Sequence, residues 1–169
     1  MGEKDEAKEK EKEILQILEG NARLNDAEIA RMAGMDAAEV SELIAGLERK
    51  GIIRSYKTVI NYEKAGIEVV QAVIDVKVSP ERDTGYDSVA ERISRFPEVK
   101  SVRLVSGEYD LSVLVAGKTM QEVAYFVAEK IAPLEQVRNT LTHFLLKTYK
   151  ENGELYGEEE QGKRLAVTL

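Results

Sequence analysis

The residues best suited to chemistry lie together in the segment Ser106–Asp110, which reads Ser-Gly-Glu-Tyr-Asp. Exposed backbone N–H groups at a tight turn can hold a carboxylate, and the Asp110 carboxylate can pair with an ammonium group. Gly107 would let the backbone approach a ligand closely. The same residues also suit a purely structural hairpin, in which glycine supplies a positive φ and aspartate bonds the backbone. The spacing leaves both interpretations open.

The rest of the sequence offers little other chemistry. The chain has no cysteine, which excludes disulfides, thiol nucleophiles and Cys-based zinc sites. Its single histidine, His143, argues against a His-rich metal site within one chain. In a predicted strand, a solvent-exposed or hydrogen-bonded structural role suits this residue better than a pH-sensing or ligand-binding one. Gly-rich phosphate loops are absent and the carboxylates are scattered. We expect no enzyme, cofactor or metal.

Length and charge set further limits. The 169 residues suit one ordinary domain or two small ones, and with 43% hydrophobic residues they can bury a core. The formal net charge of −7 argues at first against a nucleic-acid partner. The largest share of that charge falls in residues 151–169, however, so net charge alone does not exclude DNA binding. Without an apolar run of about 18 residues or a secretory signal, we expect a cytoplasmic protein with no membrane partner.

The N-terminal third is expected to be helical. Apolar residues recur at helical spacing from residue 14 onward. Asn25 and Glu28 have the spacing of a capping box, Gly34 should end that helix, and Asp36 should cap the next. Three short helices, the last two separated by a tight turn, predict a helix-turn-helix unit. The sequence thus predicts a charged extension over residues 1–10 and a helix-turn-helix domain over residues 11–53.

After a connector over residues 54–66, the apolar period changes from helical to two, which indicates strands. The predicted order of elements is β-α-β-β-α-β, with a hairpin between strands 99–106 and 109–116 and a last strand over 137–150. This order predicts an α+β chain in which a ferredoxin-like domain over residues 67–150 follows the helix-turn-helix. Crossover handedness places both helices on one face of a four-stranded antiparallel sheet. Residues 151–169 are predicted to be an acidic tail.

The two predicted halves, in this order, resemble the Lrp/AsnC (feast/famine) family of transcription regulators over about residues 11–150. Three motifs carry the resemblance: Leu47-Glu48-Arg49-Lys50-Gly51-Ile52-Ile53-Arg54-Ser55-Tyr56, Phe96-Pro97-Glu98-Val99, and Ser106-Gly107-Glu108-Tyr109-Asp110-Leu111. The segment Gly162–Val167 also resembles a bacterial subgroup thought to act on alanine or aminotransferase genes. The resemblance implies a DNA-binding regulator of amino-acid metabolism.

In such proteins the C-terminal domain binds an amino acid between dimers, beside the hairpin. The resemblance implies a homodimer that packs sheet to sheet and assembles further, into a tetramer or octamer. Thr140 and Thr142 match a Thr-x-Thr in the last family strand and are implied to face the same pocket, although β-propensity alone also explains them. The implied effector-binding residues are Ser106, Gly107, Glu108, Tyr109, Asp110, Thr140 and Thr142.

The predicted recognition helix is unusually acidic. Between Asp36 and Glu48 there are four acids and no base, a departure from the family pattern. Base contacts could still use serine, small alanine side chains or a glutamate that accepts from cytosine. Phosphate contacts would come from basic residues after the helix. The candidate DNA-binding residues are Ala37, Ala38, Ser41, Glu42, Arg49, Lys50, Arg54 and Lys57.

Two other functions stay open at this point. The acidic helix-turn-helix could bind a protein instead of DNA, which would make the chain a metabolite-sensing oligomeric module. A relative of this two-domain fold works as a decarboxylase in tetrapyrrole synthesis, but the resemblance calls for histidine and arginine in its pocket. A single histidine argues against that enzyme.

Overall fold

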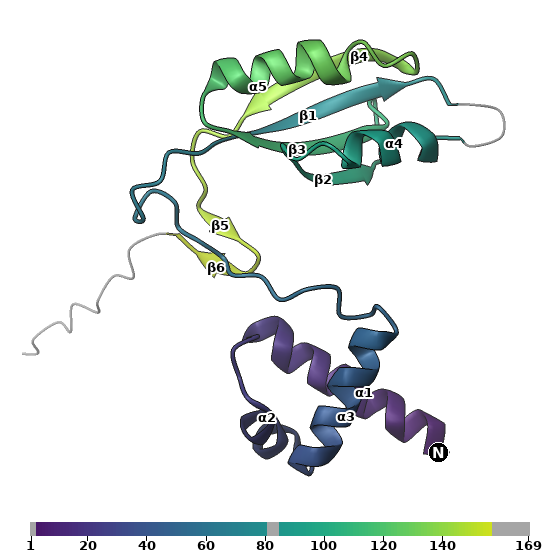
Figure 1. Cartoon of the computed structure of the whole chain (residues 1–169), viewed down its shortest axis with the longest axis vertical. Coiled ribbons are helices and arrows are strands. Elements are labelled where there is room, and N and C mark those ends of the chain that lie inside the picture. Colours follow the sequence, from purple (N-terminus) through teal and green to yellow (C-terminus); the bar gives the residue numbers. More distant parts are fainter. Residues whose placement is uncertain (1–2, 81–84, 157–169) are drawn as a thin grey trace, which may run out of the picture. The chain divides into compact units, whose positions relative to one another are not determined.

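The computed structural model describes residues 3–80 and 85–156, which fall into two compact units divided between Thr58 and Val59 (Figure 1). The division lies inside the predicted connector over residues 54–66. Within the described residues, no helix is long and apolar enough to cross a membrane.

The first unit is a three-helix domain. Its helices are α1 (Glu3–Gly20), α2 (Asp26–Ala33) and α3 (Ala37–Arg49). They bury a common core that includes Ile14, Ile29, Val40 and Leu47, each with 0% exposure. The apolar residues that recur at helical spacing in the sequence therefore form the buried face of each helix, and the predicted helix-turn-helix is confirmed. Because α1 begins at Glu3, most of the charged N-terminal extension is helical.

The helix ends follow local sequence signals in part. Asn25 Oδ1 accepts from the Glu28 N–H at 3.0 Å, and Glu28 Oε2 accepts from the Asn25 N–H at 2.9 Å. This is the predicted capping box. Gly34 ends α2 with a left-handed φ of 64°, a conformation that glycine adopts without strain. Asp36 occupies the N-cap position of α3, but its side chain makes no capping hydrogen bond.

The second unit has the predicted β-α-β-β-α-β order. Its elements are β1 (Val70–Val78), α4 (Asp87–Ser94), β2 (Val99–Leu104), β3 (Leu111–Gly117), α5 (Met120–Phe126) and β4 (Val137–Phe144). The strands form one antiparallel sheet in the order β2-β3-β1-β4. Helix α5 continues into one short π-helical segment, Val127–Ile131. The predicted α+β, ferredoxin-like fold is confirmed.

One face of this sheet carries the core. Alternate residues of β1 and β3, such as Ile74 and Val113, are fully buried. They pack in one cluster with Ile93 of α4 and with Val123 and Phe126 of α5. Both helices therefore cover the same face, as the crossover rule predicts. The intervening residues of β1 and β3 are only partly buried, so no element of the described residues covers the opposite face.

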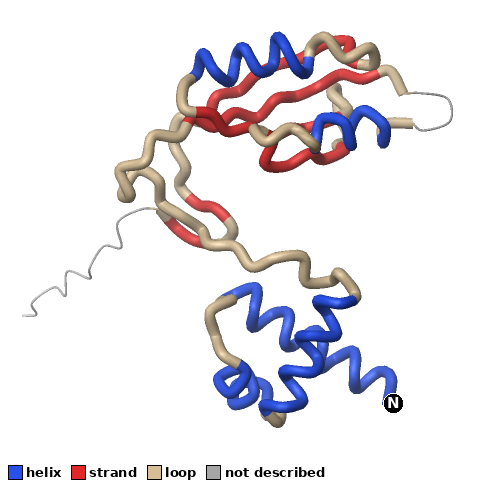
Figure 2. The backbone as a smooth tube through the Cα atoms, in the orientation of Figure 1, coloured by secondary structure: helices blue, strands red, loops and turns tan. Residues whose placement is uncertain are grey.

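The end of the last strand differs from the prediction. Strand β4 stops at Phe144, which pairs with Ala72 of β1, and one further hydrogen bond runs from the Leu145 N–H to the Gln71 carbonyl. The chain then forms a small hairpin from β5 (Lys150–Glu151) and β6 (Glu154–Leu155), visible as two short red segments in Figure 2. The predicted tail thus begins with structure at residue 151, and its remainder, residues 157–169, lies outside the described residues.

Candidate functional site

Helix α3 presents a narrow outward face. Ala38, Ser41 and Glu42 are exposed, while the apolar residues of the helix turn toward the core. Ala37 is partly buried and packs against that core. Three of the four residues predicted to contact bases thus lie on the solvent side of α3, and Ala37 does not.

Two ion pairs join α1 to α3. Lys10 Nζ lies 2.8 Å from Glu39 Oε1, and Lys50 Nζ lies 2.6 Å from Glu11 Oε1. The hydrogen bond and the charge of Glu39 raise the pKa of Lys10 above its usual value. The pair with Lys10 offsets the negative charge of Glu39, one of the acids on the predicted recognition helix α3. The second pair occupies a lysine that the sequence predicts to contact phosphate.

The other predicted phosphate ligands are Arg49, Arg54 and Lys57, and all three are exposed. Among the residues that the structure describes, neither Arg49 nor Arg54 has an acidic partner. Their guanidinium groups are therefore available to an external anion.

The Ser106–Asp110 segment forms the loop of the β2–β3 hairpin, closed by a hydrogen bond from Val105 N–H to the Asp110 carbonyl at 2.9 Å. Asp110 Oδ2 accepts from the Val78 N–H at 2.8 Å, and its carboxylate also meets Lys77 Nζ and the Tyr86 hydroxyl, each at 3.4 Å. Asp110 therefore ties the hairpin to the end of β1. This geometry supports the structural interpretation of the aspartate.

Gly107 behaves differently from the structural expectation. Its φ is not positive, and a Cβ added to it would meet nothing within 4 Å. The hairpin itself therefore does not require glycine at this position. Of the two roles that the sequence suggests for Gly107, a positive φ and the close approach of an external group, only the second is compatible with this geometry.

The hydrogen bond from the Val78 N–H holds the pKa of Asp110 below its usual value of 3.8, with help from Lys77 and against partial burial. A depressed pKa contributes stability that is fully present above pH 3.8 and is lost as the pH falls toward the folded-state value. We expect Asp110→Asn to lower the urea midpoint at pH 7. The difference from the parent chain should narrow below about pH 4. A difference that persists unchanged at pH 3 would contradict this account.

The predicted threonines lie on the helix-covered face. Thr140 pairs with Val76, and Thr142 pairs with Ile74, and both threonines are half-buried. The carbonyl of Val76 also accepts from the Asp110 N–H at 3.1 Å, so the base of the hairpin and Thr140 share a neighbour on β1. Tyr109 reaches β4 as well, because its hydroxyl accepts from Asn139 Nδ2 at 3.3 Å.

His143 lies on the uncovered face of the sheet. Its Nε2 is 3.1 Å from Asp75 Oδ2 on the neighbouring strand. The predicted role as a hydrogen-bonded sheet residue is confirmed. Within residues 3–80 and 85–156, no group of three His, Asp or Glu side chains is arranged to hold a metal.

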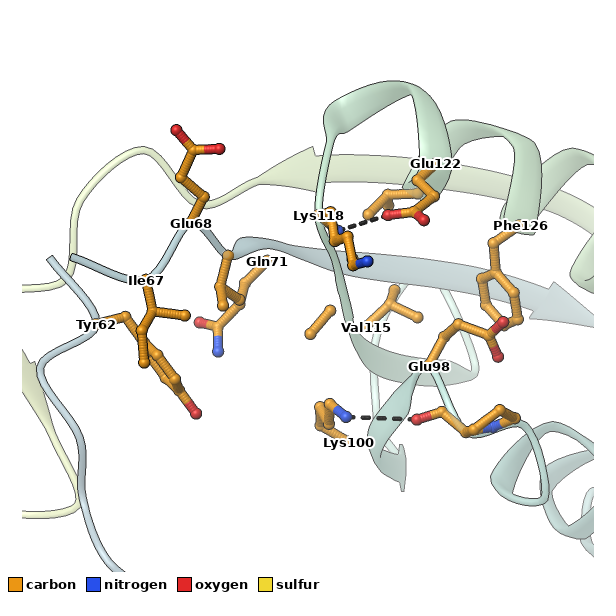
Figure 3. A pocket seen from close by; sticks show the side chains of 15 residues that line it. Tyr62, Ile67, Glu68, Gln71, Glu98, Lys100, Val115, Lys118, Glu122 and Phe126 are labelled. Atoms are coloured by element: carbon orange, nitrogen blue, oxygen red, sulfur yellow. Dashed lines mark hydrogen bonds between the residues drawn. The ribbon is translucent and has the colours of Figure 1, made fainter. Parts of the chain in front are cut away.

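A pocket that the sequence did not predict opens at the far end of the sheet from the hairpin, with a volume of about 630 Å³ (Figure 3). It combines residues from the starts of β1 and β2, the end of β3 and the first turns of α5. Val115, Val123 and Phe126 form an apolar floor, and Lys100 and Lys118 stand at its edge. No short motif links such distant positions, so the pocket could not be predicted from the sequence.

Comparisons with known proteins cover both units. A model described as winged helix-turn-helix DNA-binding matches residues 8–54, and one described as Lrp/AsnC ligand binding domain matches residues 71–155. The HTH-type transcriptional regulator YugG of Bacillus subtilis is 48% identical over 161 residues, which cover 95% of this chain and 97% of that protein. The regulator FL11 of Pyrococcus furiosus is 30% identical over 86% of this chain and 93% of its own length.

Solved structures agree on the fold. Escherichia coli AsnC superposes with a TM-score of 0.65 at 21% identity, covering 85% of this chain and 94% of that one. A transcriptional regulator of Neisseria meningitidis, solved as a complex with L-Met, gives a TM-score of 0.65 at 25% identity, covering 84% and 91%. Since both halves match in order and a relative is nearly half identical along almost the whole length, the chain belongs to the Lrp/AsnC family of helix-turn-helix transcriptional regulators.

Proposed function

We propose that the chain binds double-stranded DNA through α3 and regulates genes of amino-acid metabolism in response to an amino acid held by its second unit. The observation that carries the DNA-binding proposal is the outward row of Ala38, Ser41 and Glu42, followed by the exposed guanidinium groups of Arg49 and Arg54. Small side chains allow close approach to bases, and the arginines can neutralise phosphates.

The residues proposed to bind the effector remain those around the hairpin, from Ser106 to Asp110, with Thr140 and Thr142. Gly107 leaves room for an external partner, because nothing lies within 4 Å of the position that a Cβ would take. The Neisseria relative is described as a complex with L-Met, which supports an amino acid as the class of ligand. The Asp110 carboxylate contributes mainly by holding the loop in place.

The proposed partner in assembly is a second copy of the chain, seated on the uncovered face of the sheet. Val73 and Leu114 pair across β1 and β3, and Leu141 lies on β4 opposite Asp75, so partly exposed apolar side chains line that face. A two-fold dimer would present two α3 helices and would favour a palindromic DNA site. Further assembly to a tetramer or octamer would bring hairpins of different dimers together.

Regulation then follows from linkage. An amino acid that prefers one assembly shifts DNA affinity by the same coupling free energy that DNA exerts on amino-acid binding, typically about 1–3 kcal/mol. Such coupling corresponds to a change in DNA affinity of about 5- to 150-fold.

The test is a titration of the full chain onto its own upstream DNA at several salt concentrations, with and without amino acids. We expect binding at low salt, a linear fall of log K with log[salt], and a shift in affinity with at least one amino acid. Absence of binding at low salt under all of these conditions would refute the proposal.

A further inference from the structure

The pocket at the Gly117 end of the sheet lies away from the hairpin. Strand β3 runs from Leu111, beside the hairpin, to Gly117, at the edge of the pocket. With a rise of about 3.4 Å per residue, the two sites are about 20 Å apart. The pocket therefore cannot be part of the hairpin site within one chain.

The floor of the pocket is the open end of the domain core. Val115, Val123 and Phe126 are 1%, 2% and 7% exposed, and their side chains meet the pocket from β3 and α5. On the opposite wall the apolar side chain of Ile67 is 52% exposed. The volume of about 630 Å³ is within the range of about 300–1,000 Å³ typical of small-molecule sites. The interior thus suits an apolar group.

The rim carries charges of both signs. In Figure 3, Lys118 and Lys100 lie on either side of Val115, while Glu98 lies on the side nearer Phe126 and Glu68 points away. Lys100 Nζ donates to the Pro97 carbonyl at 3.3 Å, a bond that leaves its remaining protons available. The carboxylate of Glu122 is already engaged, because its Oε2 accepts from the Lys118 N–H at 2.6 Å.

Glu98 is the acid that remains. Its carboxylate has no partner among the described residues, although the residue is only partly exposed. The rim therefore offers two ammonium groups and one carboxylate around an apolar floor. A ligand that satisfies all three carries a carboxylate, an ammonium group and an apolar body.

We propose that this pocket is a second small-molecule site, which binds an α-amino acid with an apolar side chain. The α-carboxylate lies between Lys100 and Lys118, the α-ammonium meets Glu98, and the side chain contacts Val115 and Phe126. The inference rests on the proposed function in one respect, that the chain responds to amino acids, but it assigns them a different place in the second unit.

The test is calorimetric titration of the full chain with L-leucine, L-methionine and L-phenylalanine as probes, and with 4-methylpentanoate, which is leucine without its amino group. We expect at least one amino acid to bind, and 4-methylpentanoate to bind at least tenfold more weakly than leucine. The double variant Lys100→Glu/Lys118→Glu should weaken amino-acid binding at least tenfold. Because both lysines are exposed, circular dichroism should show an unchanged fold.

Two further variants locate the site. Lys130→Glu reverses one lysine charge, half the change of the double variant, at an exposed residue of the π-helical segment that does not line the pocket, so it should leave binding unchanged. Gly107→Arg fills the open space at the hairpin, so it should remove binding at the proposed effector site while the signals of leucine at the pocket remain. Amide chemical shifts on adding leucine should move at Gly117 and Lys118.

Three results would overturn the inference. One is binding that Gly107→Arg abolishes while Lys100→Glu/Lys118→Glu retains it, which would assign the amino acid to the hairpin and leave the proposed function intact. The second is a lack of binding by all three amino acids. The third is equal affinity for leucine and 4-methylpentanoate. Failure of the proposed function would be seen separately, as a lack of DNA binding.

Discussion

At 0.1 M salt, the double variant Arg49→Ala/Arg54→Ala is expected to bind double-stranded DNA about 4,000-fold more weakly than the parent chain, because each copy in the proposed dimer loses two phosphate contacts. Each phosphate contact releases condensed counterions and contributes about 0.9 to the slope of log K against log[salt]. Four lost contacts per dimer therefore remove about 3.6 from log K at 0.1 M salt, and they reduce the slope by the same amount. Fluorescence anisotropy with a labelled duplex at four salt concentrations measures both quantities.

The matched control is Arg92→Ala/Arg95→Ala, which removes two exposed arginines, one in the last turn of α4 and one at its C-cap, in the second unit. It changes the net charge equally, so a general effect of charge would appear in both variants. We expect the control to leave the slope unchanged. A slope that stays the same in Arg49→Ala/Arg54→Ala would contradict the assignment of these two residues as phosphate ligands.

Lys50 is less suited to such a variant because its ammonium group is already paired with a carboxylate. Its ammonium is held 2.6 Å from Glu11, and DNA would have to displace that exposed pair before the lysine could contact a phosphate. Exposed pairs contribute only about 0–1 kcal/mol, so the exchange is feasible, but a Lys50 variant would combine two effects. Arg49 and Arg54 report on phosphate contact more directly.

The acidity of α3 is also less severe than the sequence alone indicates. Glu39 is paired with Lys10, and Glu48 accepts from the Tyr56 hydroxyl at 2.9 Å. Burial, followed by this bond to Glu48, raises the pKa of Tyr56 above its usual value, so the hydroxyl stays protonated. Glu42 is left as the exposed acid in the middle of the outward face, where it could accept from a cytosine amino group.

The features that the sequence predicted well are local ones. The capping box of Asn25 and Glu28 needs only a spacing of three residues, and it forms as expected. The alternation along β1 places Ile74 in the core and Asp75 on the opposite face for the same reason, since a strand repeats every two residues. The order of such local elements was sufficient to predict the fold.

The features that the sequence did not predict depend on pairs of distant residues. Lys10 and Glu39 are 29 positions apart, and the bond between Asp110 and the Val78 N–H joins residues 32 positions apart. No periodicity or motif encodes either contact. The pocket near Gly117 is still harder to predict from the sequence, because its lining residues range from Tyr62 to Phe126. The end of β4 was missed because it depends on the pairing register with β1, in which Phe144 lies opposite Ala72.

Replacing Leu114 by arginine is expected to convert the proposed dimer into a monomer. Leu114 lies on β3, on the uncovered face, between Val73 of β1 and Ser101 of β2. In a monomer the guanidinium can reach solvent, because this position is only partly buried. At a sheet-to-sheet interface it would be buried without a partner, which costs several kcal/mol, so the dimer dissociation constant should rise at least about 100-fold. Sedimentation velocity at micromolar concentration measures the mass.

The control for that change is Tyr125→Arg, which puts the same charge at an exposed position of α5, on the helix-covered side of the domain. It should leave the mass of the parent assembly unchanged. Because a palindromic site is read by two α3 helices held at a fixed spacing, the monomeric Leu114→Arg variant should also lose affinity for upstream DNA while its circular dichroism stays native. A dimer of unchanged mass in Leu114→Arg would show that the two copies meet through another surface, and the loss of DNA affinity would then not be expected.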